Sequence, residues 1–144
     1  MPVNDDPDVL QREIFVEASP ETVFEFLVEP WLMAQWIGLA HTLEPWAGGT
    51  FRVEVSRGYV ARGVYREVVR PRRVVFTWGW EEAADAALRD LRPGTSLVEI
   101  DLEPRGGGTH VRLRHSGLTK VVSGRHGERW RHYLVRLAAV ARGR

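Results

Sequence analysis

The chain has 144 residues, of which 44% are hydrophobic, 27% charged and 10% aromatic, with a formal net charge of +1. That size and balance fit one globular domain and disfavour disorder, and the lack of cysteine excludes disulfides, thiol chemistry and zinc–thiolate sites. No apolar run approaches the roughly 20 residues that span a bilayer, and the acidic start is unlike a secretory signal. We therefore expect one domain over 1–144, with a mobile tail at 1–8, cytoplasmic and without membrane insertion.

Residues 10–18 predict a first strand, because branched and aromatic residues are frequent there. Ser19-Pro20-Glu21 follows as a helix-start signal: a capping hydroxyl, a proline in the first turn, and an acid at the positive end of the helix dipole. Pro30 ends that helix and can open a second one, which runs to Gly38. Two short helices joined at a proline are thus expected.

After Gly48-Gly49 the hydrophobic pattern changes to a period of two, which is typical of half-buried strands. Strands are predicted at 51–56, 59–69, 74–80, 97–103 and 111–115. Short turns join most of them, which favours an antiparallel meander. The alanine-rich residues 81–93 are compatible with a short helix or a mobile loop.

A last amphipathic helix is predicted near the C-terminus. Its apolar positions recur at helical spacing and comprise Trp130, Tyr133, Leu134, Leu137, Ala138 and Ala141. We expect Trp130 to open this helix and its aromatic stripe to lie on the sheet.

Several short motifs occur in a specific order along the chain. They are residues 18–24 (ASPETVF), the pair Trp31 and Trp36, residues 48–51 (GGTF), 63–68 (GVYREV), 73–78 (RVVFTW), 107–109 (GGT), 115–118 (HSGL), and Trp130 with Leu134 and Leu137. From about Glu13 to Ala141 the chain thereby resembles the START-like superfamily, also called SRPBCC. Within it, the chain is most similar to the branch related to the C-terminal domain of the activator of heat-shock-protein-90 ATPase.

The resemblance implies an α+β helix-grip fold, as in birch-allergen-like proteins: a curved antiparallel sheet wrapped around a long C-terminal helix, with two short helices after the first strand. It also implies a cavity between sheet and helix, with residues 81–93 over one end as a lid or a passive loop. The family usually has a glycine directly before the tryptophan of the last helix. In this chain Arg129 precedes Trp130 and the nearby glycine is Gly127, so the sequence defines the helix start only to within one turn.

The candidate ligand-binding residues are mostly aromatic and come from every predicted element around that space. They are Trp31, Trp36, Phe51, Tyr65, Phe76, Trp78, Trp80, His115, Leu118 and Trp130. Tyr65 and His115 are the expected polar anchors, and the others form either cavity walls or plain core. An empty cavity of about 300 Å³ would cost roughly 7 kcal/mol, comparable to the stability of a whole domain. Such a cavity must therefore hold a ligand or be filled by side chains.

No catalytic, metal or cofactor site is predicted. The five histidines lack zinc-ligand spacing, and the glycine-rich residues 104–108 lie between two strands as a hairpin turn rather than a phosphate loop. Acids crowd the first thirty positions and bases follow Arg105, which we interpret as complementary surfaces and not as a nucleic-acid patch.

Three functional hypotheses follow. The first is binding of a hydrophobic or aromatic small molecule, lipids included, in the cavity between the sheet and the last helix. The alternative is a chaperone-accessory, stress-response or other protein-interaction module. The third is a cyclase or aromatase-like enzyme, which the lack of an acid/base pair makes the least favoured. Monomer and homodimer both stay open, because such a sheet has edge strands.

Overall fold

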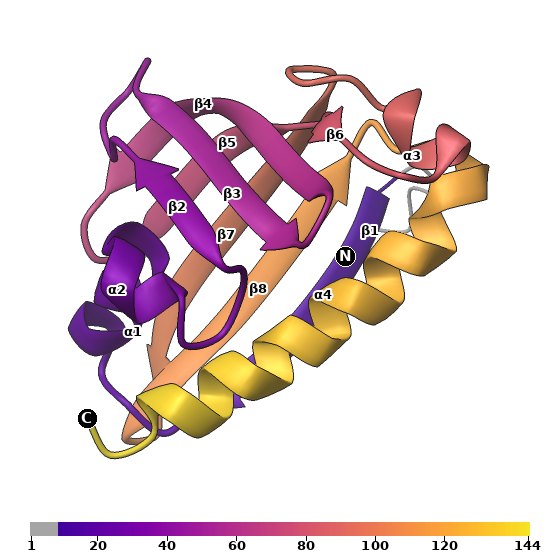
Figure 1. Ribbon diagram of the computed structural model, residues 1–144. Helices are drawn as coiled ribbons and strands as arrows, with labels where there is room; N and C mark the ends of the chain where they lie inside the picture. Colours follow the sequence, from indigo (N-terminus) through magenta and orange to yellow (C-terminus); the bar gives the residue numbers. More distant parts are fainter. Residues whose placement is uncertain (1–8) are drawn as a thin grey trace.

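The computed structural model describes residues 9–144, so the tail predicted at 1–8 lies outside the described residues (Figure 1). Eight strands are β1 (Val9–Val16), β2 (Ala40–Leu43), β3 (Thr50–Ser56), β4 (Tyr59–Val69), β5 (Arg73–Trp78), β6 (Trp80–Glu82), β7 (Ser96–Arg105) and β8 (Gly108–Ser116) within this range. The helices are α1 (Pro20–Val28), α2 (Pro30–Met33), α3 (Ala86–Arg89) and α4 (Lys120–Ala141).

The strands form one antiparallel sheet in the order β1-β8-β7-β5-β4-β3-β2, with β6 paired to β4. Along most of this sheet, strands that follow one another in the sequence are also paired, as expected of a meander. The exception is β1, the first strand, which pairs with β8, the last strand. In Figure 1 the sheet curves over α4, with α1 and α2 at one end of that helix and α3 at the other. The predicted helix-grip fold is confirmed.

The signal for the first helix acts as predicted. The Ser19 hydroxyl accepts the Thr22 backbone N–H at 3.2 Å, and Pro20 occupies the first turn. The second helix is shorter than expected, because α2 ends at Met33. Turns continue to Ile37, whose N–H reaches the Met33 carbonyl at 2.9 Å. On α4, Arg136 donates to the carbonyl oxygens of Gln35 and Trp36, which ties this turn to the long helix.

Two strands differ from the prediction. The short β2 was missed, because its residues do not alternate strongly and only pairing with β3 makes them a strand. The strand predicted at 74–80 is split at Gly79. A Cβ on Gly79 would lie 1.9 Å from the Arg92 carbonyl oxygen, so the loop after β6 packs directly against its backbone. Consequently β5 pairs with β7, whereas β6 turns to pair with β4.

The long helix also differs, because α4 begins at Lys120 and Trp130 lies well inside it. Gly124 and Gly127 have low helix propensity, so the local sequence does not predict the first turns of this helix. The Gly127 carbonyl accepts the Arg12 Nε–H at 3.3 Å, and an added Cβ there would lie 3.1 Å from Leu10 Cδ1. Close packing on β1 therefore sustains the helix where the local sequence does not.

Charged side chains cover the outer face of the sheet. Arg73 binds Glu99 at 2.7 Å, Asp101 at 2.9 Å and Glu67 at 3.1 Å. Two further ion pairs, Glu13–His110 and Glu17–Arg142, join early acids to late bases. Among residues 9–144, no helix is both long and apolar enough to span a bilayer.

Candidate ligand cavity

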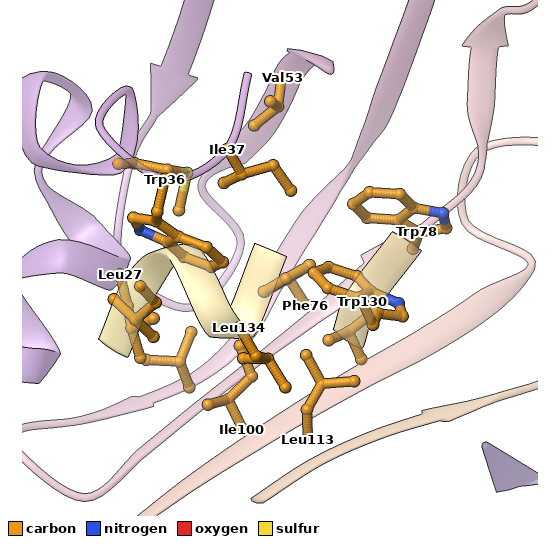
Figure 2. Packing of buried hydrophobic residues seen from close by; sticks show 14 of the residues in the cluster. Leu27, Trp36, Ile37, Val53, Phe76, Trp78, Ile100, Leu113, Trp130 and Leu134 are labelled. Atoms are coloured by element: carbon orange, nitrogen blue, oxygen red, sulfur yellow. The ribbon is translucent and has the colours of Figure 1, made fainter. Parts of the chain in front are cut away.

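The inner face of the sheet meets α4 in a dense aromatic cluster around Trp78. The Trp78 ring lies 5.2 Å from Trp130, 5.5 Å from Trp80 and 5.7 Å from His115, measured between ring centroids. Figure 2 shows Trp78 and Trp130 together, with Phe76 beside them and Trp36 farther toward the α1 end. Packing of this kind stabilises a core and equally suits a flat apolar ligand.

A cavity of about 40 Å³ remains in this cluster at the α3 end. Its apolar wall is formed by Ile37, Val55, Trp78, Trp80, Leu88 and Trp130. Four side chains of α4 complete it: Arg125, His126, Arg129 and Tyr133. Because Arg125 and Arg129 are exposed, this side of the cavity opens to solvent.

A second cavity of about 10 Å³ lies deeper in the core, beside Trp36, Phe51 and Phe76. Ile37 and Trp130 line both cavities and therefore separate them. Sites for drug-sized ligands measure roughly 300–1,000 Å³. Side chains thus fill most of the space between the sheet and α4 that the resemblance implied.

His115 lies within a chain of hydrogen bonds that runs from Trp130 through Ser96 to the Trp78 carbonyl. The Trp130 indole N–H donates to its Nδ1 at 3.0 Å, so the ring proton is on Nε2. Nε2–H donates to Ser96 Oγ at 2.9 Å, and Ser96 donates to the Trp78 carbonyl at 2.6 Å. Burial holds the pKa of His115 well below its usual range, and nearby His126 lowers this pKa further. The ring is neutral and has no free nitrogen.

His126 is held in the same way with the opposite tautomer. Its Nε2 accepts the Trp80 indole N–H at 3.2 Å, and Nδ1–H donates to the Val122 carbonyl at 2.9 Å. Burial lowers its pKa, and the charges of Arg125 and Arg129 add to that effect. Across residues 9–144, no group of three or more acidic or histidine side chains is placed to hold a metal ion.

Four buried side-chain atoms have no hydrogen-bond partner among the described residues: Nε of Arg112 and of Arg114 in the sheet, and, in the aromatic core, the Tyr65 hydroxyl and the Trp78 indole N–H. Burial raises the pKa of Tyr65, so its hydroxyl stays protonated. Trp78 is only 3% exposed and lines the larger cavity. Since unpaired buried donors are rare in native proteins, this N–H is the polar feature that best indicates a ligand.

The predicted site residues fall into groups. Trp78, Trp80 and Trp130 line the larger cavity, while Trp36, Phe51 and Phe76 line the smaller one with Trp130. Tyr65, His115 and Leu118 are buried but line neither cavity. The inward position predicted for Trp31 is wrong, because its side chain is 65% exposed. In the single turn of α2, Leu32 and Met33 are buried instead.

Sequence reasoning missed the polar side chains of α4. The three that it missed, Arg125, His126 and Arg129, extend the Trp130 stripe toward the N-terminus at helical spacing, whereas Tyr133 was already on the predicted stripe. A helix begun at Lys120 would have placed them on the cavity side. The histidine that lines the cavity is therefore His126, whereas His115 lines neither cavity.

The segment 81–93 contains the short helix that was one of its two predicted forms. Leu88 extends from α3 into the cavity wall. The Asp85 carboxylate accepts the Ala87 N–H at 2.8 Å at the start of α3 and also pairs with Arg125 of α4. This segment thus covers the α3 end of the cavity and is attached to α4 by an exposed ion pair.

Comparison with known proteins gives a family match and a consistent fold. Residues 17–142 match the family described as Activator of Hsp90 ATPase homolog 1-like protein. An AHSA1-like protein from Rhizobium etli, solved by NMR, is 41% identical with a TM-score of 0.72, over 94% of this chain and 82% of that one. A protein from Mesorhizobium loti is 25% identical with a TM-score of 0.79, over 91% and 94%. The Aha1 dimer from Colwellia psychrerythraea, at 17% identity and a TM-score of 0.76 over 94% and 96%, shares the fold. No curated protein matches the chain.

Proposed function

The chain belongs to the family of Activator of Hsp90 ATPase homolog 1-like proteins, and we propose that it binds a hydrophobic or aromatic small molecule between its sheet and α4. The observation that carries this proposal is the cavity beside Trp78, Trp80 and Trp130, which reaches solvent next to Arg129. A sealed core would need no such opening. The walls would bind the ligand by burial and stacking.

The cavity volume limits the ligand. At about 40 Å³ it admits only part of an aromatic ring without movement of the surrounding segments. A ring that buries about 150 Å² gains roughly 4 kcal/mol, which corresponds to a Kd near 1 mM. We therefore expect weak binding of single rings, and tighter binding of larger molecules that displace Leu88 or Ile37.

Tryptophan fluorescence tests the proposal directly. Single-ring aromatics, hydrophobic dyes and lipids are titrated to millimolar concentration against a variant carrying Trp31→Phe and Trp46→Phe, which removes two exposed indoles and leaves the buried ones. We expect at least one of these three classes of compound to quench the tryptophan fluorescence in a saturable way. No response across the whole panel would contradict small-molecule binding.

A pair of filling variants locates the site. Val55 lines the cavity, so Val55→Phe should abolish the fluorescence response by occupying the space. Val64→Phe places the same ring at a partly exposed position of β4 outside the cavity and should leave the response unchanged. Equal effects of both variants would rule out this cavity as the binding site.

The cyclase or aromatase hypothesis gains no support from the cavity. Both nearby imidazoles use both ring nitrogens inside the protein, and no carboxylate lines the cavity among the described residues. A reaction that needs a base has none free here.

A chaperone-accessory role remains the second candidate. The family description names an activator of Hsp90 ATPase, and Trp31, Leu39 and Trp46 are more than half exposed. Large exposed apolar side chains are frequent in protein interfaces. The ATPase rate of an Hsp90-type chaperone, measured with the wild type and with Trp31→Ala, tests this role. An ATPase rate that the wild type raises and the variant does not would support this role. An ATPase rate that the wild type leaves unchanged would contradict it.

A further inference from the structure

The open side of the cavity carries one arginine, Arg129, that no acid among residues 9–144 pairs with. Arg125 and Arg129 are exposed on α4 and line the cavity, whereas no aspartate or glutamate among residues 9–144 does so. Arg125 pairs with Asp85. Arg129 forms no ion pair with any described residue, which leaves a guanidinium free at the entrance.

Beside the cavity, one indole N–H has no acceptor among the described residues. The Trp78 indole N–H is buried and unpartnered, and both nitrogens of His126 are used within the protein. The Trp78 nitrogen has almost no accessible surface, so the charge preference of the ligand is set by Arg129 and not by this N–H.

The helix places the charge beside the aromatic wall. Arg125 and Arg129 are four residues apart, as are His126 and Trp130, so two adjacent stripes of α4 face the same opening. The charges of Arg125 and Arg129 also contribute, after burial, to the lowered pKa of His126 in the cavity wall. An anionic group near Arg129 would thus adjoin a ring that packs on Trp130.

We propose that the ligand is a small aromatic carboxylate, with its ring among Trp78, Trp80 and Trp130 and its carboxylate on Arg129 at the open side. This inference rests on the proposed function and narrows it to one chemical class. An arginine fork matches the two oxygens of a carboxylate, and the indole rings match a flat apolar body. The three tryptophans therefore select the ring, and Arg129 selects the charge.

Three probes of nearly equal shape test the class. Benzoate, benzamide and benzylamine are titrated to 20 mM, on the order of twenty times the Kd expected of a single ring, and the indole N–H signals are followed by NMR. Benzoate should bind at least tenfold more tightly than benzamide, and benzylamine should not bind. The indole signals of Trp78, Trp80 and Trp130 should shift most, because these three rings line the cavity.

Two charge variants assign the anchor. Arg129→Gln keeps an exposed polar side chain and should reduce the benzoate advantage over benzamide to less than threefold. Arg131→Gln removes the same charge from the same helix outside this cavity and should keep the advantage. A benzoate advantage that survives Arg129→Gln would overturn the assignment.

The outcomes separate the two proposals. Equal binding of benzoate and benzamide would overturn the preference for an anion while supporting small-molecule binding. Binding of octanoate but not benzoate would overturn the aromatic part. If neither these probes nor the fluorescence panel binds, the proposed function itself fails.

Discussion

His115 and His126 each accept an indole N–H and are thereby fixed as neutral rings in the core. Below pH 6.5 the unfolded chain protonates these residues more readily than the folded protein does, because burial lowers both pKa values. The unfolded state then binds more protons, so the free energy of unfolding falls as the pH falls. His41, whose pKa burial also lowers, contributes in the same direction.

We therefore expect stability to be constant above pH 7 and to decrease between pH 6.5 and 5. As the pH falls, each histidine ring that stays neutral in the folded protein lowers the free energy of unfolding by up to about 1.4 kcal/mol per pH unit. Urea unfolding at several pH values measures the slope. The variant His126→Gln should reduce it, while His132→Gln, at an exposed position of the same helix, should not. An identical slope in wild type and His126→Gln would contradict the assignment.

At the scale of elements, α4 contains two glycines with opposite surroundings. A Cβ on Gly124 would meet nothing within 4 Å, so Gly124→Ala should stabilise the protein by about 0.5–1 kcal/mol through helix propensity alone. A Cβ on Gly127 would lie 2.5 Å from Arg12 Nη2 and 3.1 Å from Leu10 Cδ1. Gly127→Ala should therefore lose that gain. Thermal unfolding compares the two, and equal gains would show that β1 does not restrict the helix.

The segment with α3 depends on one carboxylate that has two partners. Asp85 caps α3 and pairs with Arg125, and the hydrogen bond from Arg125 is the main cause of its lowered pKa. Asp85→Asn keeps a capping oxygen but loses the charge, whereas Asp85→Ala loses both. Hydrogen exchange in residues 83–91 should be slowest in the wild type, faster in the asparagine variant and fastest in the alanine variant. Unchanged exchange in both variants would contradict an attachment of this segment through Asp85.

Whether an element could be predicted depends on how far apart in the sequence its stabilising contacts lie. The capped helix α1 and the alternating strand β7 depend on local signals, and both were predicted. The split at Gly79 and the start of α4 depend on the Arg92 carbonyl and on β1, which are distant in sequence. The same limit explains the site: the tryptophans were found by residue type, whereas Arg129 and His126 needed the correct start of α4.

At the scale of the whole molecule, Ile37 and Trp130 separate two cavities that together extend from the α3 end toward α1. Ile37 lies in the turn after α2 that Arg136 attaches to α4. Removing its side chain should join the cavities into one continuous space. A variant without this side chain should therefore have room for a larger ligand, with a lower free energy of unfolding.

Ile37→Ala should destabilise the protein by about 2–5 kcal/mol and increase its affinity for a bulky hydrophobic dye. Ile100→Ala is the matched control, because Ile100 is equally buried but lines only the smaller cavity. Its stability loss should be similar, since the same atoms leave a packed core, but its dye affinity should match that of the wild type. Denaturant unfolding and dye titration measure both quantities. If the two variants bind the dye equally well, general loosening of the core explains the binding, and Ile37 does not control the size of the site.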